Sequence, residues 1–339
     1  MNEKNQIVVA VIGAGYWGPN LVRNFSAVEN TCVKYVCDLS AERLGKIKKS
    51  FPFVEITQDY DLVLQDVEVD AVLIATPVSS HFPLAKKALE SGKHVFVEKP
   101  MAQSVKQCSE LVSMAEKKHL ILGVDHTFLF TGSVQKMKEL IHKNEIGHIF
   151  YFDSERINLG LIQTDVNVIW DLAPHDISIM NYLFDSAKPI AVFATGASYV
   201  SEKQIEMAHV TIYFDTGAVG HIHVSWLSPL KIRKILVGGN KKMLLYNDLE
   251  PSEKLKVYDK GVSIDYNELS PSKPLYRAGD VSIPKLNETE ALFQEAKLFV
   301  EAIQGKSKFF VDGLAGLEVV KILEACDRSI AEERKIDLF

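Results

Sequence analysis

A glycine-rich turn near the amino terminus is the first segment whose residue types indicate a ligand. Gly13, Gly15 and Gly18 have the spacing G-x-G-x-x-G and follow an apolar run at residues 6–12. After a strand, the first glycine permits a tight turn, the second lets a pyrophosphate approach the backbone, and the third lets the next helix pack closely. Unpaired N–H groups at the helix start attract the same anion. The spacing therefore predicts a dinucleotide site.

An acidic residue provides a second test of that prediction. Asp38 stands 38 − 18 = 20 residues after Gly18, at the end of a predicted strand at residues 32–38. A carboxylate there binds the ribose hydroxyls of NAD and repels the 2′-phosphate of NADP, so NAD is the predicted cofactor. Arg43 nearby leaves the use of both dinucleotides open. The alternative is a turn without a ligand, in which Asp38 caps the next helix.

Two further segments end predicted strands in the same region. Ala75-Thr76-Pro77 follows the apolar run at residues 69–76, and Glu98-Lys99-Pro100 follows the run at 94–98. In an open parallel sheet, ligands bind outside the carboxyl ends of the strands. A lysine placed there, beside a nicotinamide, donates to a substrate oxygen. The alternative for Glu98 and Lys99 is an exposed ion pair before a turn-forming proline.

The elements that must position these residues alternate in the first third of the chain. Helical stretches separate predicted strands at residues 6–12, 32–38, 54–57, 69–76, 94–98 and 120–124. This alternation predicts a doubly wound parallel sheet, an α/β Rossmann domain over residues 1–124. Closely spaced strands then follow at residues 149–157, 190–200, 209–214, 220–227, 234–237 and 255–258. They predict an α+β domain over residues 125–339 with a large, open, mainly antiparallel sheet.

Two more predictions concern the carboxyl-terminal part of the chain. The polar, proline-containing residues 260–284 are expected to form a loop or arm. Helices are expected at residues 288–303 and 313–331, where apolar residues recur at helical spacing. These closing helices pack either on the second domain or back on the first.

Composition excludes several classes of function. The 339 residues are 47% hydrophobic and carry a formal charge of −6 with no basic run, which argues against nucleic acid and anionic membranes as partners. The four cysteines, at Cys32, Cys37, Cys108 and Cys326, form no C-x-x-C pair, so neither a disulfide framework nor a metal is expected. The chain shows no signal-peptide pattern and no apolar stretch of membrane-spanning length, and a reducing cytoplasm is the expected location.

These motifs together resemble the Gfo/Idh/MocA oxidoreductases. The residues that support the resemblance are Gly13–Gly18, Asp38, Ala75-Thr76-Pro77 with His81, Glu98-Lys99-Pro100, and the pair Asp171 and His175. The resemblance covers essentially the whole chain and implies NAD(P)-dependent oxidation or reduction of a sugar, cyclitol or similar polyol. It also implies that Tyr16, Trp17, Arg43, Thr76, Pro77, His81, Glu98 and Lys99 bind cofactor with the three glycines and Asp38.

The resemblance also assigns catalytic roles. Lys99 matches the lysine that contacts the reacting hydroxyl or carbonyl, His175 matches an acid/base histidine, and Asp171 matches its partner. If residues 171–182 are helical, the spacing i, i+4 puts Asp171 and His175 on one face. A histidine suits proton removal near neutral pH. The chain departs from the family pattern at Ser178, where many members have an aspartate, and Asp176 either substitutes for it or pairs locally.

Other residues are weaker candidates for the substrate site. His126, followed by Thr127, is expected either to line the pocket or to be a structural histidine, and Arg156 and Asn158 either bind a substrate group or, for Arg156, form a surface ion pair. Trp170 either stacks on a ligand or lies in the core. His221 and His223 share a strand face, but no third ligand accompanies them, so no metal is predicted. Apolar residues on both sheet faces predict a homodimer or homotetramer formed through the second sheet.

The sequences GYWGPN and NVIWDLAPHD narrow the expected substrate, again by resemblance. They are similar to a subgroup that acts on nucleotide sugars, related to UDP-N-acetylglucosamine and UDP-N-acetylglucosaminuronate 3-dehydrogenases of surface polysaccharide biosynthesis. One alternative is a dehydrogenase of free sugars or cyclitols such as inositol. Another is a non-catalytic NAD-binding regulator, against which Lys99, Asp171 and His175 argue because a sensor needs none of them.

Overall fold

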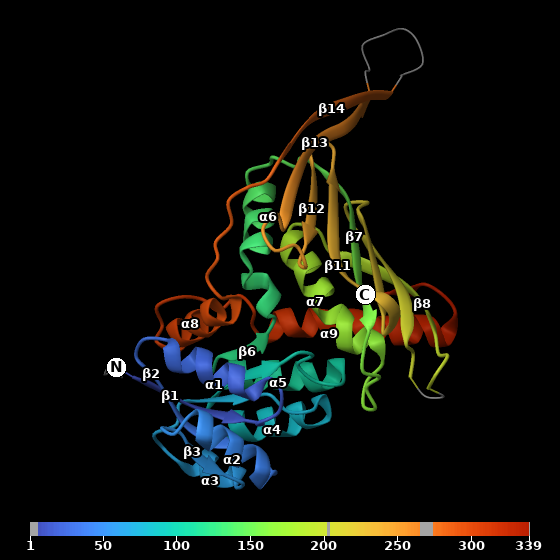
Figure 1. Ribbon diagram of the computed structural model, residues 1–339. Helices are drawn as coiled ribbons and strands as arrows, with labels where there is room; N and C mark the ends of the chain where they lie inside the picture. Colours follow the sequence, from blue (N-terminus) through green and yellow to red (C-terminus); the bar gives the residue numbers. More distant parts are fainter. Residues whose placement is uncertain (1–5, 202–203, 265–273, 339) are drawn as a thin grey trace. The chain divides into compact units, whose positions relative to one another are not determined.

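Runs rich in valine and isoleucine form a six-stranded parallel sheet in the computed structural model, which describes residues 6–201, 204–264 and 274–338 (Figure 1). The sheet order is β3-β2-β1-β4-β5-β6. Its strands are β1 (Ile7–Ile12), β2 (Thr31–Cys37), β3 (Glu55–Thr57), β4 (Ala71–Ile74), β5 (His94–Glu98) and β6 (Leu122–Asp125). Helices cover both faces of such a sheet, so β4 is buried at every position. The predicted doubly wound fold is confirmed.

The helices of this sheet begin in two different ways. They are α1 (Gly18–Ala27), α2 (Ala41–Ser50), α3 (Tyr60–Gln65), α4 (Val78–Glu90) and α5 (Val105–Lys118). Ser40, Asp59 and Ser104 cap α2, α3 and α5, whereas no described side chain caps α1 or α4. These two helices follow β1 and β4, the neighbouring strands at which the sheet order reverses. Their unpaired N–H groups therefore lie where open α/β sheets bind ligands.

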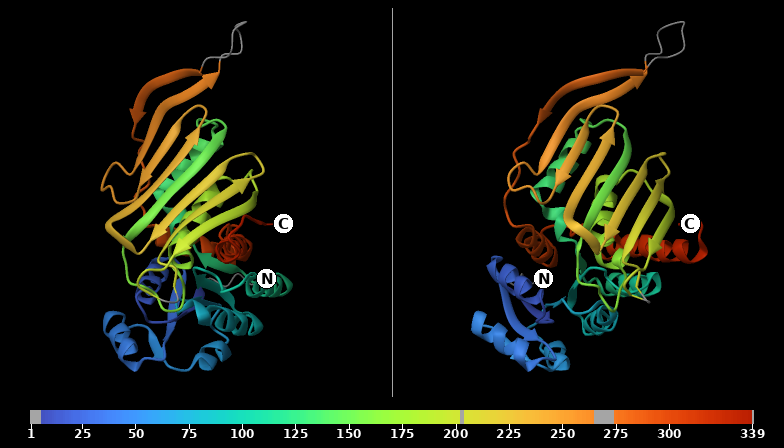
Figure 2. Two further views of the ribbon diagram at one scale, coloured as in Figure 1. Left: turned by 90° about the vertical axis from the view of Figure 1, so that its right-hand side faces the viewer. Right: turned by 45° about the vertical axis from the view of Figure 1, so that its right-hand side comes forward.

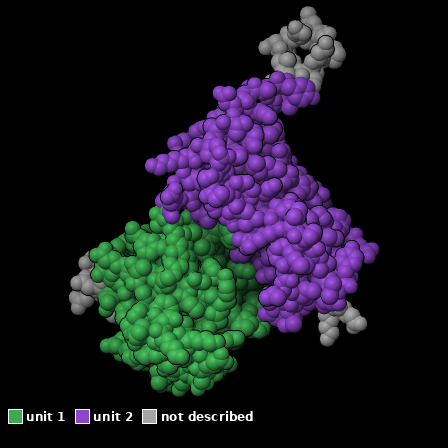
Figure 3. Space-filling view, viewed as in Figure 1, with its two compact units in different colours: residues 1–130, 289–321 green, residues 131–288, 322–339 purple. Residues whose placement is uncertain are grey.

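The first of the two units into which the chain divides is discontinuous in sequence (Figure 3). It contains residues 1–130, including the 3₁₀ helix η1 (Thr127–Phe130), and residues 289–321, including α8 (Ala291–Ile303). Phe299 of α8 packs edge-on against Phe25 and Phe96, with ring centroids 6.2 and 5.2 Å apart. The division of the chain falls within α9 (Gly313–Glu332), after Lys321. The first closing helix thus belongs with the parallel sheet.

The second unit is built on a nine-stranded sheet with the order β14-β13-β12-β11-β7-β10-β9-β8-β15. Its strands are β7 (Ile149–Leu159), β8 (Pro189–Ala197), β9 (Met207–Phe214), β10 (Val219–Ser225), β11 (Leu227–Gly239), β12 (Met243–Asn247), β13 (Leu255–Ile264), β14 (Pro274–Ser282) and β15 (Ile336–Asp337). Among the described strands of this second sheet, only β7 and β10 pair in parallel, so the prediction of a mainly antiparallel sheet is confirmed. The helices α6 (Gly132–His142) and α7 (Val168–Leu183) lie along one face (Figure 2).

Residues 260–284 were expected to form a loop or an arm, and the prediction of a loop was wrong where the structure describes the segment. Strands β13 and β14 pair through most of this segment, with Val262 opposite Tyr276. The side chains of these two residues are 44% and 80% exposed, so the ribbon has the polar composition of a loop although its backbone is paired. Pro274 stands at the start of its strand, where a missing N–H is tolerated. Residues 265–273 of the predicted loop lie outside the described residues. None of the described helices combines the length and apolarity needed to cross a bilayer.

Candidate active site

The three glycines of the turn differ in what surrounds them. Gly13 has φ +101°, and a Cβ atom there would lie 2.3 Å from the carbonyl oxygen of Ala75. A Cβ atom at Gly18 would lie 2.1 Å from the carbonyl oxygen of Gly13. At Gly15, by contrast, a Cβ atom would meet no described atom within 4 Å. The first and third glycines are therefore required by the fold, while the second leaves open space above the backbone, which fits the approach of a pyrophosphate.

Gly15→Ala tests this space directly. We expect the variant to fold with an unchanged melting temperature, because the methyl group touches nothing in the protein, yet to bind NAD at least about tenfold more weakly because the methyl group blocks the phosphates. Gly45→Ala is the matched control, since Gly45 lies in α2 and a Cβ atom there also meets nothing within 4 Å. Calorimetric titration measures the NAD affinity of both variants. Equal affinities for the two variants would contradict the assignment of the turn.

Asp38 holds the turn from the neighbouring strand. Its Oδ2 accepts a hydrogen bond from Ala14 N at 2.6 Å, and its Oδ1 accepts one from Ser40 N at 2.7 Å. The guanidinium of Arg43 lies 3.9 Å from Oδ2 and is largely exposed. Ser40, not Asp38, caps the following helix. Asp38 thus has a structural role toward the turn that its spacing alone did not reveal, in addition to the ribose contact predicted for it.

A buried histidine bridges the segments that follow β4 and β5. His81, on α4, is 1% exposed; its Nδ1 lies 2.9 Å from the carbonyl oxygen of Pro100 and its Nε2 lies 2.7 Å from that of Thr76. Both ring nitrogens are therefore engaged by backbone. We reassign His81 from a cofactor contact to a positioning residue that fixes the segments bearing Thr76 and Lys99. Glu98 and Lys99 themselves are half-buried.

His126 lies directly after β6 and is also 1% exposed. Neither of its buried ring nitrogens has a hydrogen-bond partner among the described residues. Burial, and then the positive charge of Lys99, lower the pKa of His126 to about 3, so the ring is neutral near pH 7. A buried polar ring without a partner is unfavourable in a purely structural role, which favours the pocket alternative for this residue.

In the second unit, α7 presents the predicted acid/base pair on one side. Asn167 caps this helix by accepting hydrogen bonds from Ile169 N and Trp170 N at 3.0 and 3.1 Å. Asp171 and His175, one turn apart, are half-buried among largely buried residues of the helix. Asp171 accepts a hydrogen bond from Trp226 Nε1 at 2.9 Å, which fixes its carboxylate. The predicted shared face of this pair is thus present.

Arg156 and Asp176 form an ion pair within the second unit. The guanidinium Nε and one terminal nitrogen of Arg156 lie 2.7 and 3.0 Å from the two carboxylate oxygens of Asp176, and both side chains are at most 5% exposed. Burial lowers the pKa of Arg156, but the carboxylate outweighs it, so the pKa is raised. The ion-pair alternative therefore describes Arg156, although the pair is buried rather than at the surface, and Asp176 is its local partner. We remove Arg156 from the substrate residues.

The remaining candidates divide between core and surface. Trp170 is 7% exposed and donates from Nε1 to Asp327 at 2.6 Å, so it is a core tryptophan rather than a free stacking platform. Asn158 is half-buried on β7, and Tyr16 of the turn is 91% exposed. Among the described residues, which include His221 and His223, no three His, Cys, Asp or Glu side chains are arranged to hold a metal.

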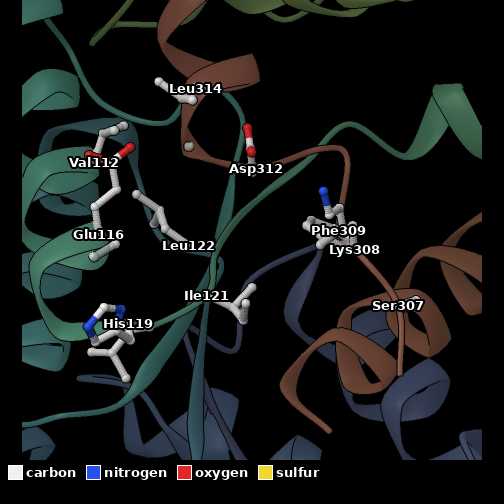
Figure 4. A pocket seen from close by; sticks show the side chains of 13 residues that line it. Val112, Glu116, His119, Ile121, Leu122, Ser307, Lys308, Phe309, Asp312 and Leu314 are labelled. Carbon is white, nitrogen blue, oxygen red and sulfur yellow. The ribbon is translucent and has the colours of Figure 1, made fainter. Parts of the chain in front are cut away.

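A hollow of about 530 Å³ lies elsewhere in the first unit (Figure 4). It is lined by α5 and by residues 307–314, and it reaches Leu122, the first residue of β6. Figure 4 shows Glu116, Asp312 and Lys308 around it. The hollow therefore lies at the amino end of β6, whereas Asp125 and His126 mark the carboxyl end. It is not part of the predicted cofactor site.

The parallel sheet, the open glycine and the two uncapped helices define an NAD-binding oxidoreductase of the Rossmann type. Comparison with known proteins agrees with this class and identifies the family within it. Residues 7–126 match the family model described as "Oxidoreductase family, NAD-binding Rossmann fold", and residues 134–245 match "GFO/IDH/MocA C-terminal domain". The chain belongs to the Gfo/Idh/MocA family of oxidoreductases. It is an NAD-binding oxidoreductase that acts on CH–OH groups, and its relatives include dehydrogenases of a nucleotide sugar and of inositols.

Several relatives show the breadth of this similarity. The uncharacterized oxidoreductase YrbE of Bacillus subtilis is 31% identical over 64% of this chain and 66% of its own length. UDP-N-acetylglucosamine 3-dehydrogenase of Acidithiobacillus ferrooxidans is 27% identical over 91% of this chain and 93% of its own. A solved structure of the enzyme of that name from the same organism aligns with TM-score 0.82 over 96% of this chain and 98% of that chain, at 24% identity. Myo-inositol 2-dehydrogenase of Thermotoga maritima is 23% identical over 97% of this chain and 98% of its own.

Proposed function

We propose that the enzyme transfers hydride between NAD and a ring hydroxyl or keto group of a nucleotide sugar, at the 3-position of UDP-N-acetylglucosamine or its uronate, in surface polysaccharide biosynthesis. The observation that carries this proposal is the similarity to UDP-N-acetylglucosamine 3-dehydrogenase over 91% of the chain. The half-buried Asp171 and His175 on one side of α7 supply the acid/base chemistry such a reaction needs.

In this mechanism the chain's own residues orient the alcohol and move its proton. Bound NAD supplies the two-electron acceptor that the reaction needs. His175 takes the hydroxyl proton during oxidation and returns it during reduction. Asp171 orients the imidazole of His175. Lys99 donates a hydrogen bond to the reacting oxygen and holds it in place. Lys99 belongs to the first unit and His175 to the second, so their meeting at one oxygen is part of the proposal. His126 and Asn158 are the proposed further substrate contacts.

The cofactor is proposed to lie along the carboxyl ends of the parallel strands. Gly13, Gly15, Tyr16, Trp17 and Gly18 receive the pyrophosphate with the start of α1, Asp38 and Arg43 border the adenosine ribose, and Thr76, Pro77, Glu98 and Lys99 border the nicotinamide half. Two observations support this arrangement, namely the open space at Gly15 and the absence of a described capping side chain at α1.

Nicotinamide fluorescence with a panel of substrates tests the proposal. We expect turnover with UDP-N-acetylglucosamine or its uronate. Turnover confined to free sugars or cyclitols would favour the inositol-type alternative, which the relative from Thermotoga maritima keeps open. Tight NAD binding without turnover on any of these compounds would favour the regulator. We further propose a cytoplasmic homodimer or homotetramer formed through the second sheet, which light scattering of the purified protein tests.

Asp38→Asn tests the cofactor preference. The amide removes the negative charge and keeps an oxygen that accepts the hydrogen bond from Ala14 N, while the bond that Asp38 accepts from Ser40 N is lost. We expect the ratio of NADP to NAD affinity to rise at least about tenfold, because the repulsion of the 2′-phosphate is removed while the turn stays anchored. Glu42→Gln, which removes an exposed carboxylate from the adjacent helix, is the control. A wild-type enzyme that already prefers NADP would contradict the argument from charge.

A further inference from the structure

Two acidic side chains in the first unit are buried against each other. Asp125, the last residue of β6, is 2% exposed, and Glu295, on α8, is 0% exposed. Trp17 Nε1 donates to Asp125 Oδ2 at 2.5 Å, and both the backbone N–H and the hydroxyl of Thr127 donate to Asp125 Oδ1. The backbone N–H of His126 donates to Glu295 Oε1 at 3.0 Å. Asp125 and Glu295 thus bind neighbouring groups of residues 126–127, which brings the two carboxyl groups close enough to share a hydrogen bond.

This contact requires a proton, and its neighbours indicate which acid holds it. Ionised carboxylates only accept hydrogen bonds, so two of them in contact repel. Asp125 receives three hydrogen bonds, whereas Glu295 Oε2 is buried without a donor among the described residues. The proton is therefore assigned to Glu295, which shares it with Asp125, although burial raises the pKa of Asp125 as well. Burial, and then the charge of Asp125, raise the pKa of Glu295 well above its usual value, which agrees with this assignment.

We propose that this shared proton fastens the Gly-rich turn and thereby sets the affinity of the enzyme for NAD. Trp17 belongs to that turn and is the last residue before α1. Its indole is held by Asp125, which remains in place only while Glu295 is protonated. Loss of the proton makes the two carboxylates repel and adds negative charge beside the segment that receives the phosphates. Both effects weaken NAD binding.

The other charged groups around Asp125 and Glu295 do not account for the proposed loss of NAD affinity with rising pH. Glu98 lies opposite Asp125 on β5 and carries a further carboxylate, which adds to the repulsion. Lys99 is close enough to lower the pKa of His126, and that ring stays neutral at any pH well above about 3. On the outer side, Arg23 of α1 pairs with Glu290 through exposed side chains. Glu295 is thus the group whose proton is lost as the pH rises.

The affinity for NADH, measured by fluorescence titration without substrate, tests the proposal from about pH 6 to about pH 10. We expect wild-type affinity to fall at least about tenfold over this range. Glu295→Gln should bind within about threefold of wild type at the lower pH and show no such fall, because its amide donates to Asp125 and does not titrate. Glu301→Gln, which removes a half-buried carboxylate that pairs with Lys297 on the same helix, should retain the wild-type profile.

Trp17→Phe separates the role in cofactor binding from a purely structural one. This variant leaves both acids in place but removes the indole donor, so we expect weaker NADH binding and a smaller alkaline fall, because only the added negative charge still acts. The unliganded protein gives a readout without cofactor. Because folding raises the pKa of Glu295, its stabilising contribution is lost as the pH rises, so the melting temperature of wild type should fall relative to Glu295→Gln. Parallel pH profiles for wild type and Trp17→Phe, or for wild type and Glu295→Gln, would overturn the proposal. Because no substrate is used, a wrong sugar substrate leaves this test unaffected.

Discussion

Lys99→Ala and His175→Ala should each lower kcat at least about a thousandfold while leaving the affinity for NAD within about threefold of wild type. Lys99 holds the reacting oxygen and His175 moves its proton, so each variant removes an interaction needed in the transition state. Because the two side chains are proposed to act on one oxygen, the double variant should be scarcely slower than either single variant. Steady-state kinetics on the preferred substrate and calorimetric titration with NAD measure these effects.

His142→Ala is the matched control for the histidine, since His142 lies exposed at the end of α6. Its kcat should equal that of wild type. Multiplicative losses in the double variant would show that Lys99 and His175 act in separate steps, and an active His175→Ala enzyme would remove His175 from the acid/base role.

Asp176→Ala should reduce the free energy of unfolding by about 3–5 kcal/mol, because it leaves the guanidinium of Arg156 buried and unpaired. The double replacement Arg156→Met with Asp176→Leu should recover much of this loss, since apolar side chains of similar size need no partner there. Urea denaturation monitored by circular dichroism gives these energies.

The ion pair of Lys86 and Glu110 is the exposed control for the buried pair of Arg156 and Asp176. Its side chains are 37% and 41% exposed, so Glu110→Ala should change the free energy of unfolding by less than about 1 kcal/mol. A small effect of Asp176→Ala would show that water reaches the guanidinium, and would return Arg156 to the set of candidate substrate contacts.

The sequence was most informative where a function depends on local spacing. The turn at Gly13–Gly18 combines a strand, three glycines and a helix within a dozen residues, and each glycine has the surroundings that its position predicts. The i, i+4 spacing of Asp171 and His175 likewise fixes their common side once α7 forms. Such patterns depend on backbone periodicity, which a single sequence contains.

Interactions between distant segments could not be predicted in the same way. Asp125 and Glu295 are 295 − 125 = 170 residues apart, and nothing in either segment marks them as partners. Arg156 was expected either at a ligand or in a surface ion pair, but its partner on α7 is defined only by the packing of that helix on the sheet. The start of β13 was predicted at residues 255–258, whereas the rest of β13 and all of β14 were missed, because the described residues 276–282 are exposed and lack an apolar alternation.

The membership of α8 in the first unit affects how the protein can be synthesised and engineered. A fragment ending at residue 130 lacks Phe299, leaving the rings of Phe25 and Phe96 without the partner that covers them. On the ribosome, this half of the enzyme stays incomplete until nearly all of the polypeptide has emerged. Exchange of the cofactor module between homologues therefore requires three crossovers in the coding sequence, after residues 130, 288 and 321.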